Sequence, residues 1–134
     1  MRKLNLYFGI LLFIVFLISG WYMKNIFRPE HLNDLAARME IRANHIYILF
    51  ISLLNIIGFT VDIQTQSSWL SRIDKGSRLL LIASGILSLF AFVIEHSGTL
   101  QNRSLTFYSV VTSLAGVVLL TFSYILSARI NRTV

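Results

Sequence analysis

Apolar residues fall in four long runs along the chain, and short polar segments separate them. The runs cover residues 4–23, 45–61, 78–95 and 105–127. Each is long enough to cross a membrane as a helix, which takes ~17 to 25 residues for a hydrocarbon core of ~30 Å. The pattern predicts an all-α integral membrane protein. We expect one domain over residues 1–134, folded as a four-helix bundle with both termini on the same side.

The first run has basic residues in front of it and the aromatic pair Trp21 and Tyr22 behind it. Aromatic residues at this place are typical of a membrane interface, so the flanks predict an uncleaved N-terminal anchor. The alternative is a cleaved signal peptide, because Ser19 and Gly20 are small residues near a possible cleavage point. Ile18 fits poorly three positions before cleavage after Gly20, which favours the anchor.

A charged segment precedes the second run, and the two together are expected to form one long helix. Pro29 suits the first turn of a helix, and Glu30 and Asp34 suit the positive end of the helix dipole. No proline or glycine follows before Gly58. Residues 29–57 are therefore predicted to form a helix of ~43 Å at ~1.5 Å per residue. Since this exceeds a hydrocarbon core of ~30 Å, its first part is expected to extend outside the membrane as an amphipathic segment.

Composition supports the membrane class. The chain is 55% hydrophobic and 13% charged, whereas soluble domains are about 25% charged. The formal net charge is +6, and the basic residues lie mostly beside the apolar runs. Anionic lipid headgroups of the bilayer are therefore the expected partner, and nucleic acid is not. The absence of cysteine excludes disulfides, thiolate nucleophiles and iron–sulfur clusters.

The distribution of basic residues predicts the orientation. The side of the termini has seven near the span ends: Arg2, Lys3, Arg72, Lys75, Arg78, Arg129 and Arg132. The other side has five: Lys24, Arg28, Arg38, Arg42 and Arg103. Because cytoplasmic loops carry the excess of Lys and Arg, the count favours cytoplasmic termini, and a bacterial inner membrane is the expected location.

A polar stripe is predicted on the segment that leads into the second span. Spacings of 7, 4 and 3 residues put four side chains within ~60° of one another on a helix. These side chains are His31, Arg38, Arg42 and His45. The third run ends at the same membrane surface in Glu95 and His96. Because consecutive antiparallel spans usually pack together, we expect Glu95 near Arg42 or Arg38, and His96 near His45.

Four interpretations of this stripe stay open. The simplest is structural, because basic and histidine side chains at span ends reach the interface. In the second, His45 and His96 are the axial ligands of a b-type haem whose propionates meet an arginine. In the third, Arg38, Arg42 and His45 bind an anionic or quinone-like small molecule. In the fourth, a metal such as copper is bound by the three histidines, the nearby carboxylate and Met39, although no tight ligand spacing is present.

No sequence motif identifies a reaction or a cofactor. HExxH, GxSxG and glycine-rich phosphate loops do not occur. Asn55 in the second span is expected to donate a hydrogen bond to the third or fourth span, and serine pairs spaced four apart favour close helix packing. These pairs are Ser84 with Ser88 and Ser109 with Ser113. We therefore expect a non-enzymatic accessory or interaction component of a membrane assembly, as a homo-oligomer or with a larger membrane protein.

Overall fold

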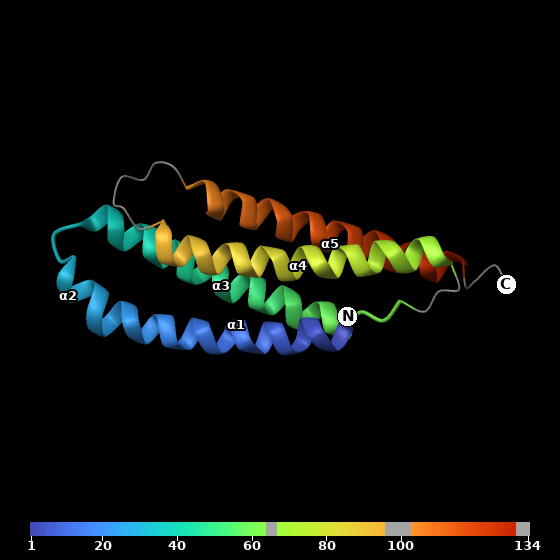
Figure 1. The fold of residues 1–134 in the computed structure, drawn as a ribbon, viewed down its shortest axis with the longest axis horizontal. Helices are drawn as coiled ribbons and strands as arrows, with labels where there is room; N and C mark the ends of the chain where they lie inside the picture. Colours follow the sequence, from blue (N-terminus) through green and yellow to red (C-terminus); the bar gives the residue numbers. More distant parts are fainter. Residues whose placement is uncertain (64–66, 96–102, 131–134) are drawn as a thin grey trace.

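The computed structural model describes residues 1–63, 67–95 and 103–130. Along the chain, the helices are α1 (Arg2–Tyr22), the π-helical turn η1 (Met23–Phe27), α2 (Arg28–Glu30), α3 (Leu35–Thr60), α4 (Ser68–Ile94) and α5 (Ser104–Ile130). α1, η1 and α2 follow one another without a break, so the molecule is a bundle of four long helical rods (Figure 1). The start of α1 and the end of α5 both lie toward the same end of the bundle. The predicted all-α four-helix bundle is confirmed.

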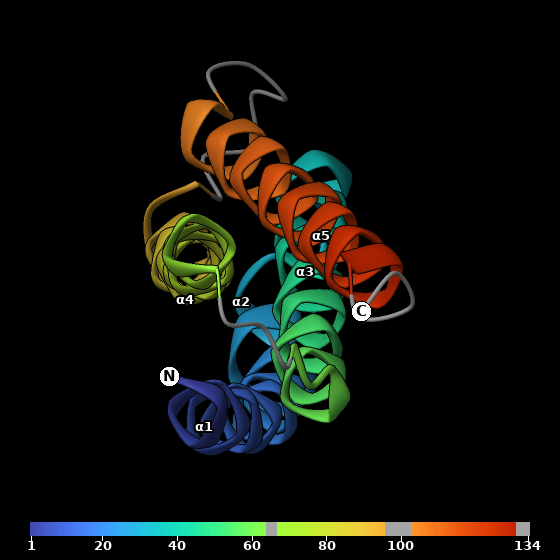
Figure 2. The same cartoon turned by 90° about the vertical axis from the view of Figure 1, so that its right-hand side faces the viewer.

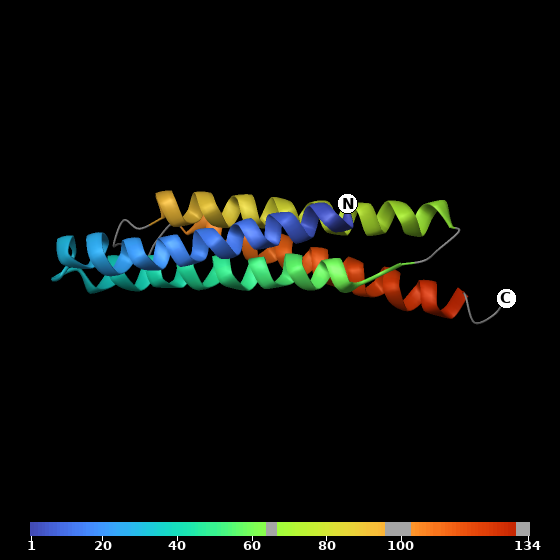
Figure 3. The same cartoon turned by 90° about the horizontal axis from the view of Figure 1, so that it is seen from below.

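The bundle consists of two helix pairs. α1 packs mainly on α3, α5 packs mainly on α4, and the pairs meet through α3 and α4. Viewed along the bundle, α1 and α5 lie at opposite edges (Figure 2). Seen from below, α1 and α3 run side by side over the length of α1 (Figure 3). α3 and α4 therefore form the contact between the two pairs, and all four rods expose large apolar side chains.

The predicted helix over residues 29–57 is wrong at its start. The first helix continues through α2, so Pro29 lies near its C-terminal end. The chain then turns over residues 31–34, and the Asp34 side chain accepts a 2.9 Å hydrogen bond from the amide of Ala37. This bond satisfies one of the free amides of the first turn of α3, which is why Asp34 begins the helix. The amphipathic segment in front of the second span is correspondingly shorter.

The wide turn η1 accommodates the proline that follows it. A proline inside a helix cannot donate to the carbonyl four residues earlier, and its ring crowds that carbonyl. In η1 the pattern of bonds is already shifted, because the amide of Arg28 donates to the carbonyl of Met23, five residues earlier. Single π-turns of this kind are common at functional sites. The first helix can therefore reach Glu30 despite Pro29.

α4, which contains the third predicted span, is longer than that span. α4 begins at Ser68, ten residues before the expected start at residue 78. Residues 68–77 are polar but contain no proline, and Gly76 alone weakens the helix. Hydropathy marked the part of α4 that is apolar enough for the membrane and not the point where the helix begins.

Small residues let the helices approach closely. An added Cβ at Gly9 in α1 would lie 2.8 Å from Ile56 Cγ1 and 3.0 Å from the carbonyl oxygen of Ser52 in α3. Between α4 and α5, the hydroxyl of Ser109 donates to the carbonyl of Ser84 at 2.9 Å. All four serines of the predicted pairs are buried. The close packing that these residues favour therefore occurs within one chain.

Candidate functional site

Four basic side chains surround a cleft of about 170 Å³ at the end of the bundle that is remote from the termini. Lys24 and Arg28 come from the first helix, and Arg38 and Arg42 come from the beginning of α3. The remaining lining residues are small or apolar: Gly20, Met23, Phe27 and Ile41. The cleft is thus lined by basic and apolar side chains together.

Local sequence spacing explains why the four cations meet. Lys24 and Arg28 are four residues apart, as are Arg38 and Arg42, so each pair shares one face of its helix. α1 and α3 are antiparallel neighbours, which brings the end of the first helix beside the start of α3. The turn over residues 31–34 joins the two helices and so keeps these two pairs of cations near each other.

The cleft has an excess of positive charge. Within the described residues, none of its four cations makes an ion pair. Arg38 donates from Nη1 to the carbonyl of Leu32 at 3.1 Å, but its Nε is buried and has no hydrogen-bond partner in the described parts of the chain. Two exposed acids are close in sequence: Asp34 uses its carboxylate to cap α3, and Glu30 makes no ion pair within the described residues. Like charges that line one cleft repel one another, so a bound anion would lower the electrostatic energy.

The predicted stripe does not lie on one helix, which corrects the expectation for His31. This residue lies in the turn before α3, where its ring stacks on Phe27 with centroids 4.1 Å apart. Its Nδ1 lies 3.1 Å from the carbonyl oxygen of Phe27. Arg38 and Arg42 do come together at the cleft. Of the two arginines and two histidines expected to align, the arginines alone share the cleft.

His45 is directed toward α1. Its ring stacks on Phe16 with centroids 4.1 Å apart, and its Nδ1 lies 2.9 Å from the hydroxyl of Ser19. The position of a Cβ added at Gly20 would be 3.5 Å from Nε2, so the first helix lies beside the second ring nitrogen. A haem bound through Nε2 would have to fit next to Gly20. His96, the other predicted axial ligand, lies outside the described residues.

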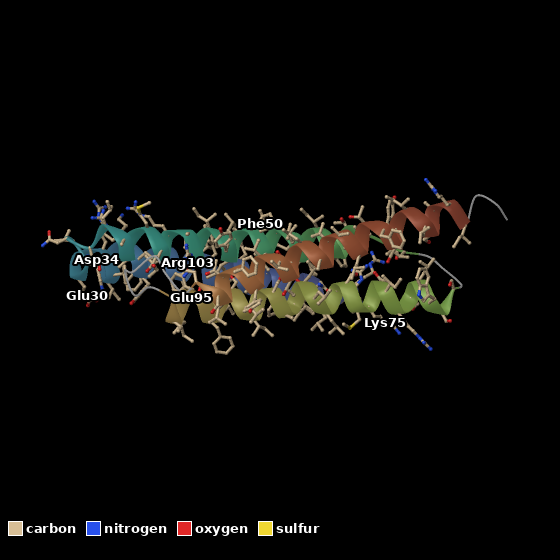
Figure 4. The ribbon with its side chains drawn as sticks, turned by 90° about the horizontal axis from the view of Figure 1, so that it is seen from above. Glu30, Asp34, Phe50, Lys75, Glu95 and Arg103 are labelled. Carbon is tan, nitrogen blue, oxygen red and sulfur yellow. The ribbon has the colours of Figure 1, made fainter. Side chains whose placement is uncertain are left out.

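Glu95 was expected to pair with Arg38 or Arg42, and this expectation is wrong. Its carboxylate accepts hydrogen bonds from the amides of Leu105 at 2.6 Å and Thr106 at 3.0 Å. The carboxylate therefore caps the N-terminus of α5, where the free amides and the helix dipole favour a negative charge. Figure 4 shows Glu95 and Arg103 at the same end of the bundle as Glu30 and Asp34, with Lys75 toward the opposite end.

Asn44 belongs to the same polar group as Glu95, and its role was not predicted from the sequence. Its amide nitrogen donates to the carbonyls of Ala91 at 3.1 Å and Glu95 at 2.9 Å, the last carbonyls of α4. Its oxygen accepts from the hydroxyl of Thr106 at 3.0 Å and from Arg103. The available signal was an amide at a core position of a helix, where a polar group needs partners.

A third polar group joins the helices near the termini. The guanidinium of Arg78 donates to the carbonyls of Gly58 and Val61 and to the carboxylate of Asp74. Nearby, Asn55 donates to the carbonyl of Leu81 in α4 at 3.1 Å and accepts from Asn5 in α1 at 3.0 Å. The predicted bond from Asn55 to the third span is confirmed. The amide of Asn55 therefore connects three helices.

Metal binding receives no support within the described residues, which contain no group of three or more histidine, aspartate or glutamate side chains placed to hold an ion. The second and third polar groups have their hydrogen bonds directed at helix ends and at neighbouring helices. The cleft differs, because its four cations line an open space and make no ion pair within the described residues. It is the strongest candidate for a ligand site in the described parts of the chain.

No protein-family model matches this chain, and neither a curated protein nor a solved structure is similar enough to match it. The fold itself defines the class. The four helical rods Arg2–Glu30, Leu35–Thr60, Ser68–Ile94 and Ser104–Ile130 are each long and apolar enough to cross a membrane. The chain is a small multi-pass membrane protein.

Proposed function

We propose that the protein is a non-enzymatic membrane component that binds an anionic group in the basic cleft. The observation that carries the proposal is the convergence of Lys24, Arg28, Arg38 and Arg42 from two helices, with no carboxylate paired to them among the described residues. An anion would supply the missing counter-charge and a partner for the buried Nε of Arg38.

The roles of the other buried polar groups support a binding function over a catalytic one. Arg78 binds the last carbonyls of α3, Glu95 binds the first amides of α5, and Asn44 binds the last carbonyls of α4. Each of these groups is used to hold helices together. The cleft cations are suited to attraction of a negative charge and include no group that is poised as a nucleophile.

The orientation belongs to the same proposal. The excess of basic residues on the side of the termini favours a bacterial inner membrane with cytoplasmic termini. The cleft then faces the outer side, and its ligand is reached from the periplasm or from the outer leaflet. The charge count supports this placement.

Melting of the purified protein in a neutral detergent tests the proposal. At constant ionic strength, chloride would be replaced by phosphate, sulfate or laurate, and a ligand that binds the folded state should raise the melting temperature. The variant Arg28→Gln/Arg42→Gln should lose this stabilisation. Both arginines are exposed and make no hydrogen bond or ion pair within the described residues, so their removal should leave the fold intact.

The matched control is Arg72→Gln/Arg129→Gln, which removes two exposed arginines from the opposite end. Its stabilisation by the anion should equal that of the wild type. If no anion stabilises the wild type, or if both double variants lose the effect equally, binding at the cleft is contradicted.

A second proposal is membership in a larger membrane assembly, either as a homo-oligomer or with a larger membrane protein. It is supported by the exposure of the first rod. In its most apolar stretch 17% of the residues are buried inside the molecule, against 39% for α4. Helix surface of this kind is available to another helix as well as to lipid. Mild crosslinking in membranes tests the proposal, and a stable monomer with no crosslinked membrane protein would contradict it.

A further inference from the structure

The depth of the cleft can be derived from the helix lengths. At the end near the termini, Arg2 and Asp62 form an ion pair with Nη1 and Oδ1 2.8 Å apart. From there Lys24 lies 22 residues along the first helix, or ~33 Å at ~1.5 Å per residue. Arg42 lies 18 residues before the end of α3 at Thr60, or ~27 Å by the same rise. Both distances match a hydrocarbon core of ~30 Å, so the cleft lies at the level of the opposite headgroups.

The size and the lining of the cleft indicate what it can hold. Its volume of about 170 Å³ is similar to that of a ~150 Å³ protein cavity that admits one benzene-sized molecule. A single phosphate group with its ester carbons is of this order, whereas a nucleotide is larger. The apolar side chains of Met23, Phe27 and Ile41 in the lining suit the hydrocarbon that follows such a headgroup.

The types of cation favour phosphate over a neutral or weakly charged acceptor. Three of the four basic residues are arginines, whose planar guanidinium groups form paired hydrogen bonds with phosphate oxygens. The donors approach from two helices, so they surround a group that has several acceptor oxygens. A quinone ring carries no charge and would leave four clustered cations without compensation.

We propose that the basic cleft is a binding site for a phosphate group, supplied either by the headgroup of an anionic lipid or by free inorganic phosphate. The inference rests on the proposed anion-binding function and specifies its ligand class. The position at headgroup depth and the apolar lining favour the lipid as the source. Lys24 and Arg28 hold one side of the phosphate, and Arg38 and Arg42 hold the other.

Fluorescence of Trp21 measures the binding. The chain has two tryptophans, and Trp21 follows Gly20 of the cleft lining, whereas Trp69 lies at the other end of the bundle. In a Trp69→Phe background the remaining signal reports on the cleft. The probes are inorganic phosphate, short-chain phosphatidylglycerol and laurate, each titrated in a neutral detergent at constant ionic strength.

Phosphatidylglycerol should bind the Trp69→Phe protein, and Arg28→Gln/Arg42→Gln should weaken this binding about 30-fold if each arginine contributes ~1 kcal/mol. Arg72→Gln/Arg129→Gln should bind as the parent does. Equal binding of inorganic phosphate with the same dependence on Arg28 and Arg42 also supports the site and identifies free phosphate as the source.

Two outcomes would overturn the inference, and they differ in what they leave standing. If laurate binds as tightly as both phosphate probes and depends equally on the cleft arginines, the cleft binds anions but is not a phosphate site. If Arg28→Gln/Arg42→Gln weakens the binding of none of the three probes, the proposed anion-binding function fails as well. Circular dichroism of each variant checks that the helices are retained.

Discussion

Arg78 in α4 donates a 2.7 Å hydrogen bond from Nη1 to the carbonyl oxygen of Gly58 in α3. The arginine side chain is fully buried, and Nη2 and Nε are also bonded, to Val61 and Asp74. Carbonyls at the C-terminus of a helix have no partner within the helix and attract cations. One arginine of α4 therefore closes the end of α3 and joins the two helix pairs.

Replacement of Arg78 by alanine should destabilise the bundle by about 3 kcal/mol, because it removes one partner from a buried ionic group. The carbonyls of Gly58 and Val61 would lose their donors. Unfolding in mixed detergent and dodecyl sulfate measures the change. Arg72, which is exposed, lies on the same helix α4, and Arg72→Ala should change stability by less than ~0.5 kcal/mol. Equal effects of the two substitutions would show that Arg78 is not a helix cap.

Glu95→Ala should destabilise the bundle by about 1 to 2 kcal/mol, which is the usual cost of losing a helix N-cap. The amides of Leu105 and Thr106 would lose their acceptor, so they should exchange hydrogen faster than amides in the middle of α5. Glu30→Ala is the control because Glu30 is exposed. Unchanged exchange at Leu105 and Thr106 would contradict the capping role.

Two glycines in helices give a matched test of close packing. Gly9→Ala should push α1 from α3 and disturb the 2.8 Å bond from the hydroxyl of Ser52 to the carbonyl of Gly9, because the new Cβ meets the backbone at 3.0 Å. Gly76→Ala should stabilise α4 by about 0.5 to 1 kcal/mol, because nothing lies within 4 Å of the new Cβ. Unfolding measurements on both variants should give opposite signs.

The pair Asn5 and Asn55 should show a measurable coupling. Single and double alanine variants form a double-mutant cycle, and interhelical hydrogen bonds in membranes give coupling of about 0.6 to 1.7 kcal/mol. The donor–acceptor distance of 3.0 Å and the full burial of both residues favour a value in this range. Additive effects of the two substitutions would mean that the bond contributes nothing.

Cysteine labelling tests the orientation, because the chain has no natural cysteine. A maleimide that cannot cross membranes, added from outside to spheroplasts, should label Leu32→Cys and spare Arg72→Cys. Both positions are exposed and lie at opposite ends of the bundle. Labelling of Arg72→Cys alone would reverse the orientation and place the cleft on the cytoplasmic side.

The site was predicted in part. Arg38 and Arg42 were placed together because a spacing of four residues puts them on one helix face, whatever else the chain does. Lys24 and Arg28 were not connected with them, because Pro29 was interpreted as the start of the second helix. The capping bond of Asp34 outweighed that signal, and the chain reversed after Pro29 instead of before it.

The sequence by itself determined the class and the helix count, because each backbone polar group in a membrane must be satisfied within the helix and ~20 apolar residues are needed to cross it. These requirements are local and can be seen in composition alone. Which polar groups meet is decided by helix pairing and rotation, which depend on contacts between distant residues. Only the tertiary structure shows that Glu95 caps α5, that His45 contacts Ser19, and that Arg28 and Arg42 line the same cleft.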